Sequence, residues 1–454
     1  MTHTSRRGSR IPRALVAGVA CLSMAGSLAA CGGGSDDESS GAASGGGADD
    51  GSQPSGSLNI LVSSASASDA AFNTINDAFM QKYPDVDATI TSVPNDTYPA
   101  TKSAQLSAGS VDIMVVKSFV EVPEYAKDAT SDDVLMAQAG ALVDLTDEPF
   151  MENYTPSVLD AQGIGGKQYA VPTGLSYSTG VYYNKQIFKD NGLSVPTTWA
   201  ELQNVMSTLT GKGVTPFGLG GKDTWPAGLV MLGNVASAFP TLEDKQGLVE
   251  DLWTQKASLT DPDLQEILEK TQTVFDNAQA NFSGAGYDDM PAAFARGDFA
   301  MLPDGTWNQP TIDTAVDGAF DYGYFPFPGS DDAADNALLD GKIELQLAVP
   351  SSSKNQEAAL AWLEFFSDPT NYATFVDESG FSAAQPDIKA SEFLTSIADY
   401  TSTYQPAWDT LWIANTKAGE DAVYPFNYPA LSPLGTSSAE EAAQAAQTAW
   451  AAGF

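Results

Sequence analysis

The sequence predicts an α/β protein of two compact lobes. Short runs that alternate apolar and polar residues are interleaved with runs at helical spacing, which is typical of strands and helices in one mixed domain. The 454-residue chain is too long for one small domain and suits two. No repeat of fixed period is present in the sequence, which argues against a solenoid or a propeller.

The first lobe is expected to open with a strand over residues 57–62, where apolar and polar residues alternate. A helix follows, because large apolar residues recur at helical spacing up to Tyr83, and Pro84 ends it. Alternation resumes over 86–90, and the apolar run 111–116 predicts a short buried strand. Strand, helix, strand and strand in this order indicate mostly parallel pairing.

Later helices are predicted from the spacing of the capping box, a hydroxyl residue followed three positions later by Glu or Gln. This spacing occurs at Thr198 with Glu201, at Ser353 with Gln356, and at Ser438 with Glu441. Four tryptophans fall among aliphatic residues in helical patterns, so core packing is expected for them: Trp199, Trp253, Trp362 and Trp450.

The N-terminal residues carry the pattern of an export signal. Four arginines precede an apolar run from Ala14 to Ala25 that is too short to span a bilayer. The next tetrapeptide, "LAAC", resembles the lipobox of bacterial lipoproteins, in which the cysteine is diacylated. We therefore predict a signal peptide over 1–30, a lipid anchor at Cys31 and a flexible tether over 31–56. An ordinary cleavage site with an incidental cysteine is the alternative.

Composition excludes several kinds of chemistry. The other cysteine is Cys21 and the single histidine is His3, both ahead of the predicted cleavage site. The mature chain therefore lacks a histidine base, a disulfide and the usual zinc ligands, and we expect no cofactor and no metal. The net charge of −37 disfavours nucleic acid and anionic lipid surfaces as partners.

Five stretches occur in a characteristic order: "FMQKYPDVDATI", "GALVDLTD", "YAVPTGLSYSTGVYYNKQIFKDNGLSVPTTWAEL", "AAFARGDFAMLPDGTWNQP" and "AVPSSSKNQEAALAWLEFFSDP". Together they resemble the extracellular solute-binding proteins of ABC transporters, specifically the maltose-binding-like family of oligosaccharide importers. The resemblance implies a two-lobed periplasmic-binding-protein-like fold of type II, with discontinuous lobes joined by a hinge of crossing strands. It also implies a ligand between the lobes, and an ABC permease that meets the closed form.

The family pattern places lobe one at 57–174 and 326–392, and lobe two at 175–325 and 393–454. We expect a monomer that is held on the extracellular face of the bacterial cytoplasmic membrane by its lipid. The ligand expected from the resemblance is a neutral oligosaccharide.

A neutral sugar offers directed hydroxyls and flat C–H faces, so its site needs aromatic rings and a few polar side chains. The resemblance aligns two glycine-containing loops with sugar-contacting regions. "GGKDTWP" contains Trp225 with Lys222 and Asp223, and "PDGTWNQP" contains Trp307. Asp304, in the second loop, either binds a hydroxyl or shapes the turn.

Other candidates lie at the ends of predicted strands. Lys117 and Phe119 follow the strand 111–116, at the carboxyl end where ligands of open α/β sheets bind. Lys117 either donates to sugar hydroxyls or is an ordinary exposed lysine. Tyr177 lies at the expected hinge, and Asp340 precedes the strand "IELQLAV".

One late segment, "QPAWDTLW", contains two tryptophans one helical turn apart. We predict that Trp408 lines the ligand site, because it follows the break at Pro406, and that Trp412 belongs to the core.

A lipid-anchored glycoside hydrolase is the main alternative, because it needs two carboxylates and no histidine. The ordered family pattern and the lack of a hydrolase motif favour a binding protein without catalytic residues. A passive adhesin would not need tryptophans on glycine-rich turns.

Overall fold

A computed structural model describes residues 53–63, 66–419, 422 and 425–454 of the chain. The predicted signal peptide, Cys31 and most of the predicted tether lie outside the described residues. Residues 53–454 belong to one compact unit. Within the described residues, no helix has the length and apolar character that crossing a membrane requires.

The first lobe is built on a four-stranded sheet with the order β2–β1–β3–β9. Its strands are β1 (Gly56–Ser63), β2 (Val86–Val93), β3 (Ile113–Val115) and β9 (Leu347–Ala348). β1 pairs in parallel with β2 and β3, so that Ile60 has Ile90 and Ile113 as neighbours, whereas β9 is antiparallel to β3. The predicted strand, helix and parallel pairing at the start of the chain are confirmed.

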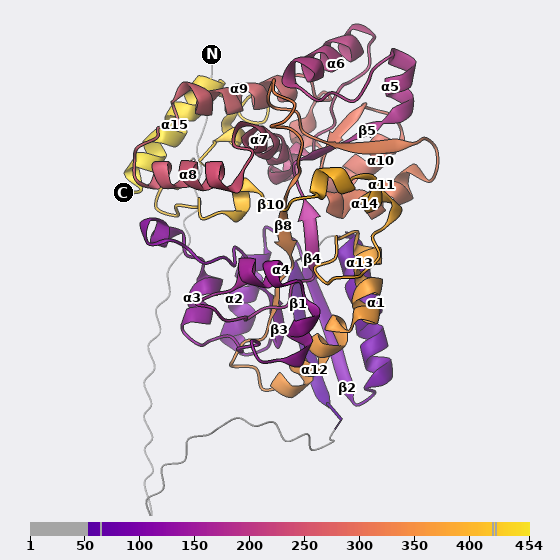
Figure 1. Cartoon of the computed structure of the whole chain (residues 1–454), viewed down its shortest axis with the longest axis vertical. Coiled ribbons are helices and arrows are strands. Elements are labelled where there is room, and N and C mark those ends of the chain that lie inside the picture. Colours follow the sequence, from indigo (N-terminus) through magenta and orange to yellow (C-terminus); the bar gives the residue numbers. More distant parts are fainter. Residues whose placement is uncertain (1–52, 64–65, 420–421, 423–424) are drawn as a thin grey trace, which may run out of the picture. The chain divides into compact units, whose positions relative to one another are not determined.

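Helices from two distant segments cover this sheet. They are α1 (Ser66–Lys82), α2 (Tyr98–Ala108), α3 (Asp132–Gln138), α4 (Pro156–Gln162), α12 (Gln356–Ser367) and α13 (Pro369–Ser379). α1 and α13 lie side by side (Figure 1). Aromatic rings join the segments in one buried cluster, which we call the first core: the Phe72 and Phe375 centroids are 4.7 Å apart, and Trp362 stacks on Phe366 at 5.5 Å. The lobe is therefore discontinuous in sequence.

The second lobe contains an antiparallel sheet, β6–β5–β7, and most of the remaining helices. Its strands are β5 (Gly180–Asn184), β6 (Met301–Pro303) and β7 (Tyr322–Pro326). The helices are α5 (Lys185–Asn191), α6 (Trp199–Gly211), α7 (Trp225–Ala238), α8 (Leu242–Trp253), α9 (Pro262–Asp276), α10 (Met290–Ala295), α11 (Gln309–Val316), α14 (Glu392–Ser396) and α15 (Ala439–Ala452).

α7 is the central helix of this lobe. Its sequence is apolar all round and nearly all of its residues are buried, as expected for a helix enclosed by others. The surrounding apolar residues form a second core, and a smaller third core lies around Tyr182 and Phe294. Trp199, Trp253 and Trp450 are buried in the second core and Trp362 in the first, so the predicted core tryptophans are confirmed.

A three-stranded sheet joins the two lobes. It has the order β10–β8–β4, with β4 (Gly174–Tyr177), β8 (Asp340–Glu344) and β10 (Gln405–Pro406). Figure 1 shows these strands between the helices of the two lobes. A side chain at Gly341 would meet the Ser176 carbonyl oxygen at 2.4 Å, so glycine is needed where β4 and β8 approach. These strands form the expected hinge of crossing strands.

Packing around the hinge bears on the lobe boundaries. Phe327 lies in the second core and Leu339 in the third, although the predicted division gives both to lobe one. Ala126, from the first segment, is also buried in the second core. The division by residue number remains a prediction.

The three predicted helix caps have different outcomes. Ser438 and Glu441 form the expected capping box of α15. α6 begins at Trp199 as predicted, but Glu201 accepts from the backbone and hydroxyl of Thr197 instead of completing a box with Thr198. The helix predicted after Ser353 is present as α12, but Ser353 does not cap it: α12 begins at Gln356 after the N-cap Asn355, and the Ser353 hydroxyl donates to Asp112 at 2.6 Å.

Candidate functional site

Three aromatic side chains of the second lobe lie together. Trp307 is half-buried and packs against both the first and the second core. Its Nε1 donates to the Tyr287 hydroxyl at 2.8 Å. Trp225, at the start of α7, is 37% exposed, and its ring centroid lies 4.6 Å from that of Tyr287 and 6.3 Å from that of Trp307. The two loop tryptophans singled out in the sequence are therefore brought together, with Tyr287 between them.

The turn that carries Trp307 is fixed by Asp304 and Gly305. A Cβ at Gly305 would lie 2.0 Å from the Trp307 ring, so only glycine allows the indole to fold back over the turn. Asp304 is 1% exposed: its Oδ1 accepts from Gly305 N at 2.8 Å and from the Tyr287 hydroxyl at 3.2 Å, and its Oδ2 accepts from Asn308 at 2.6 Å. Burial raises the pKa of Asp304 to about 7. Of its two predicted roles, this geometry corresponds to shaping the turn.

The loop before Trp225 is attached to the Tyr287 segment. Asp223 Oδ2 accepts from Tyr287 N at 2.7 Å, and Lys222 N donates to the Ala285 carbonyl at 3.0 Å. The side chains of Lys222 and Asp223 are exposed, beside the aromatic group. These bonds hold Trp225 and Tyr287 next to each other across a sequence separation of about 60 residues.

The first lobe contributes a cation at the carboxyl end of β3. Lys117 Nζ donates to Ser63 Oγ at 2.8 Å and to Asn95 Oδ1 at 3.1 Å, and it lies 5.3 Å from the Tyr98 ring centroid. Burial, assisted by the positive charge of Lys342, lowers the pKa of Lys117 to about 8. Lys117 is thus not an ordinary exposed lysine.

The hinge strand β8 contributes a second cation. Lys342 Nζ lies 4.9 Å from the Trp307 ring centroid and 3.2 Å from Glu344 Oε1. The Ser176 hydroxyl of β4 donates to the same Glu344 oxygen. The positive charge of Lys342 also lowers the pKa of Lys117, which couples the two ammonium groups electrostatically. A cation over an indole face is a favourable contact that a ligand would have to replace.

Four predicted candidates are placed away from an open surface. Phe119 is buried in the first core, and Tyr177 is buried in the third. Asp340 is paired with Lys245, whose Nζ lies 2.9 Å and 2.8 Å from its two carboxylate oxygens, and both side chains are buried. Burial raises the pKa of Asp340 to about 7. These residues support the hinge and the cores.

The fourth is Trp408, whose burial contradicts its predicted place in the ligand site, whereas Trp412 packs against the second core as predicted. Trp408 is 0% exposed in the second core and packs on Phe426 at a ring distance of 5.8 Å. Trp412 is only half-buried, and its Nε1 donates to the Tyr125 hydroxyl at 3.1 Å. The chain leaves β10 towards the second core, which buries the first tryptophan of the pair rather than the second.

Sequence reasoning missed Tyr287, Lys342, Glu344 and Asp409. Tyr287 lies in "GAGYDD", a glycine-flanked aromatic with acidic neighbours, which is the same signal that identified Trp225. Asp409 directly follows Trp408. No local signal distinguishes Lys342 and Glu344, because their importance comes from contacts with residues far away in the sequence.

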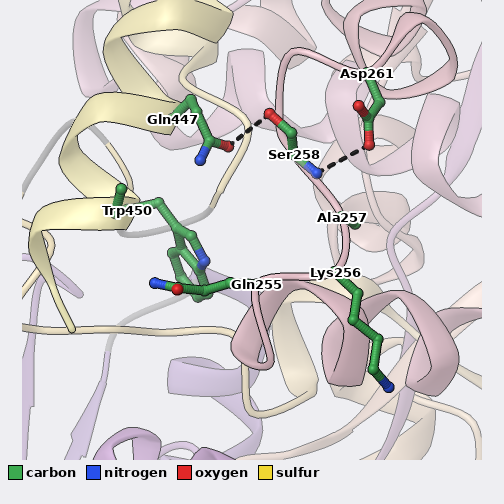
Figure 2. A pocket seen from close by; sticks show the side chains of 8 residues that line it. Gln255, Lys256, Ala257, Ser258, Asp261, Gln447 and Trp450 are labelled. Carbon is green, nitrogen blue, oxygen red and sulfur yellow. Dashed lines mark hydrogen bonds between the residues drawn. The ribbon is translucent and has the colours of Figure 1, made fainter.

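Two surface cavities lie elsewhere. One, of about 250 Å³, lies between the α8–α9 connection and α15 (Figure 2). Ser258 lines this cavity: its Oγ donates to Gln447 at 3.1 Å, and its backbone N donates to Asp261 at 2.9 Å. A larger hollow of about 860 Å³ lies beside α13 and α14. Neither is lined by a residue that the sequence analysis selected for the ligand site. Within the described residues, no group of His, Cys, Asp and Glu could hold a metal ion.

The fold and the site define a two-lobed protein with an aromatic and charged cluster where its cores meet. Residues 63–373 match the model of the family described as bacterial extracellular solute-binding protein. The chain belongs to this family.

Similar proteins extend this result. The Multiple sugar-binding protein of Streptococcus mutans serotype c is 25% identical over 324 residues, covering 71% of this chain and 73% of that protein. An uncharacterized ABC transporter extracellular-binding protein of Pyrococcus horikoshii is 24% identical over 344 residues, covering 71% and 70%. The solved structure of RafE of Streptococcus pneumoniae in complex with raffinose has a TM-score of 0.71 at 22% identity, covering 87% of this chain and 98% of that one. The structural likeness shows the fold.

Proposed function

We propose that this protein is the substrate-binding component of an ABC transporter, which captures a neutral oligosaccharide between its lobes and delivers it to a membrane permease. The observation that carries the proposal is the position of Trp307. Its half-buried indole packs against the cores of both lobes and is held by a hydrogen bond to Tyr287. The sugar-binding and ABC transporter names of the relatives support the same function.

In this proposal the aromatic group covers the C–H faces of the sugar and Lys117 donates to its hydroxyls. Trp225 and Tyr287 hold the platform, while Lys117 lies on the other lobe at the end of β3. A ligand that contacts both lobes at once favours the closed over the open arrangement by its differential affinity for the two. Closure then presents the surface that the permease recognises. The proposed binder needs no cofactor, acts as a monomer and alters no bond.

A carbohydrate array followed by calorimetry tests the proposal on the purified protein. Heat of binding at one ligand per chain, with the recovered sugar intact, is the expected result. Release of shorter sugars would instead support the cell-surface hydrolase, in which paired carboxylates cleave the ligand. If the protein neither binds nor cleaves any glycan on an array of neutral and acidic glycans, the result would favour an adhesin.

We further propose that Cys31 carries a lipid that holds the protein on the extracellular face of the cytoplasmic membrane. Two acyl chains bind a soluble domain stably, whereas one binds marginally. Cys31→Ser should move the protein from the membrane fraction to the medium in fractionated cells. A Cys31→Ser variant that stays with the membrane would contradict the anchor without affecting the sugar proposal. Size-exclusion chromatography with light scattering tests the monomer.

A further inference from the structure

The segment after the hinge brings an additional carboxylate to the region of Trp307. β10 pairs in parallel with β8, and Ala407 N donates to the Gly341 carbonyl at 2.8 Å. The chain then turns into the short helix η8 (Trp408–Thr410). Trp408 points into the second core, and Asp409 follows it within electrostatic reach of Lys342 and Glu344.

The carboxylates around this region differ in how far they are engaged. Asp304 accepts hydrogen bonds at both of its oxygens. Asp340 Oδ1 accepts from Lys245, and its Oδ2, which makes no hydrogen bond in the described part of the chain, lies 2.8 Å from the same ammonium group. Glu344 accepts from Ser176 and pairs with Lys342. Asp409 Oδ1 is buried but, within the described residues, has no hydrogen-bond partner.

A buried acceptor without a donor is unfavourable and calls for an explanation. Burial raises the pKa of Asp409, an effect that the positive charge of Lys342 opposes and the negative charge of Glu344 strengthens. The residue itself is only half-buried, so the site is not sealed within the core. A hydroxyl group of a bound ligand can supply the donor that this oxygen lacks.

We propose that Asp409 is a specificity-determining residue that accepts a hydrogen bond from a hydroxyl of the sugar stacked on Trp307. The inference rests on the proposed function and extends it to a residue of the hinge segment. Lys342 Nζ lies over the indole. A sugar ring that takes this place brings its hydroxyls among Lys342, Glu344 and Asp409, where the oxygen without a partner selects a donor at one position of the ring. Discrimination against a sugar that lacks this donor follows, because the oxygen then stays unpaired.

The test compares Asp409→Ala and Asp409→Asn with the unchanged protein by calorimetry. Raffinose, xylotriose and chitotriose are the first probes, followed by mono-deoxy analogues of whichever neutral oligosaccharide binds. We expect Asp409→Ala to weaken binding of the parent sugar roughly 10- to 100-fold, as for a hydrogen bond to a charged group. One deoxy analogue lacks the hydroxyl that donates to Asp409, and the unchanged protein and Asp409→Ala should bind that analogue with equal affinity.

Matched controls separate contact from structure. Asp399→Ala removes an exposed carboxylate from the preceding segment, changes the net charge equally, and should leave the affinity unchanged. Asp409→Asn keeps the shape of the side chain and is the second variant in case Asp409→Ala unfolds. Thermal unfolding shows whether each variant is folded. Equal losses for the parent and for every deoxy analogue, or no loss for the parent, would overturn the role of Asp409. A protein that binds no glycan on the array would instead overturn the proposed function, and this inference with it.

Discussion

The two sides of the candidate site are built differently. On the second lobe, Trp225, Tyr287 and Trp307 form a group of rings fixed by hydrogen bonds to one another and to a buried turn. On the first lobe, Lys117 is a single cation whose burial lowers its pKa to about 8. The rings offer contact area in a fixed shape, whereas the lysine offers direction and charge. A ligand held by both obtains most of its binding free energy from the rings and its orientation from the cation.

Removing the central ring tests this division most severely. Trp307→Ala should weaken oligosaccharide binding by about 2 kcal/mol or more, because an aromatic platform at the centre of a site is a typical hot spot. Calorimetry measures the loss, and thermal unfolding shows whether the variant is folded. Trp307→Phe keeps a ring without the Nε1 donor and should retain part of the affinity. Unchanged binding by Trp307→Ala would remove the residue from the site.

Removing the cation should have a smaller effect. Lys117→Met keeps the length of the side chain but loses the donor, so we expect affinity to fall about tenfold. In the unchanged protein, affinity should fall as pH rises through about 8, where Lys117 loses its proton, and the methionine variant should lack this dependence. Lys342, Lys102, Glu344 and Asp133 act on the same group. Calorimetric titrations at pH values between 6.5 and 9, spaced about half a pH unit apart, resolve this profile.

The same pKa shift has a consequence for stability in the absence of ligand. The unfolded chain keeps the Lys117 proton up to the ordinary value of 10.5, whereas the folded protein loses it at about 8. Because the unfolded state binds more protons between these values, the contribution of Lys117 to stability rises with pH across this window. Lys117→Met should therefore show a flatter stability profile there than the unchanged protein. An identical profile would mean that Lys117 is not desolvated.

Much of the fold could be predicted because its signals are local. The alternation of β1, the helical spacing of α1 ended by Pro84, and the box at Ser438 and Glu441 each determine a nearby structure. Ser353 shows where local reasoning fails. Its hydroxyl is used by Asp112, a residue more than 200 positions away, and the helix begins later than the spacing suggests.

The site was less predictable because it depends on tertiary direction. Trp408 and Trp412 have nearly equivalent local sequence, and only the path of the chain after β10 decides which one the second core buries. The contact between Lys342 and Trp307 joins a hinge strand to a loop, which no spacing encodes. An aromatic residue flanked by glycine was the useful local signal, and the same signal is present at Tyr287. The ligand roles of all these residues remain predictions.

The hydrogen bond between the rings offers a finer test of the fixed platform. Tyr287→Phe removes the hydroxyl that accepts from Trp307 Nε1 and donates to Asp304. We expect the affinity to fall three- to tenfold, since the ring remains and about 1 kcal/mol is typical of one such bond. A red or blue shift in indole emission should accompany the loss. Full affinity in this variant would mean that packing alone positions Trp307.

Asp304 provides the smallest expected effect, on stability rather than binding. Its pKa rises from the ordinary 3.8 to about 7 because the carboxyl is buried. The folded protein therefore holds a proton that the unfolded chain has lost, and the contribution of Asp304 to stability falls as pH rises through 7. Asp304→Asn never ionises. The difference between its melting temperature and that of the unchanged protein should therefore be more positive at pH 8 than at about pH 5. Asp399→Asn, at an exposed site, should show no such difference. A constant offset for Asp304→Asn would show that the aromatic platform rests on a carboxylate that is charged throughout this range.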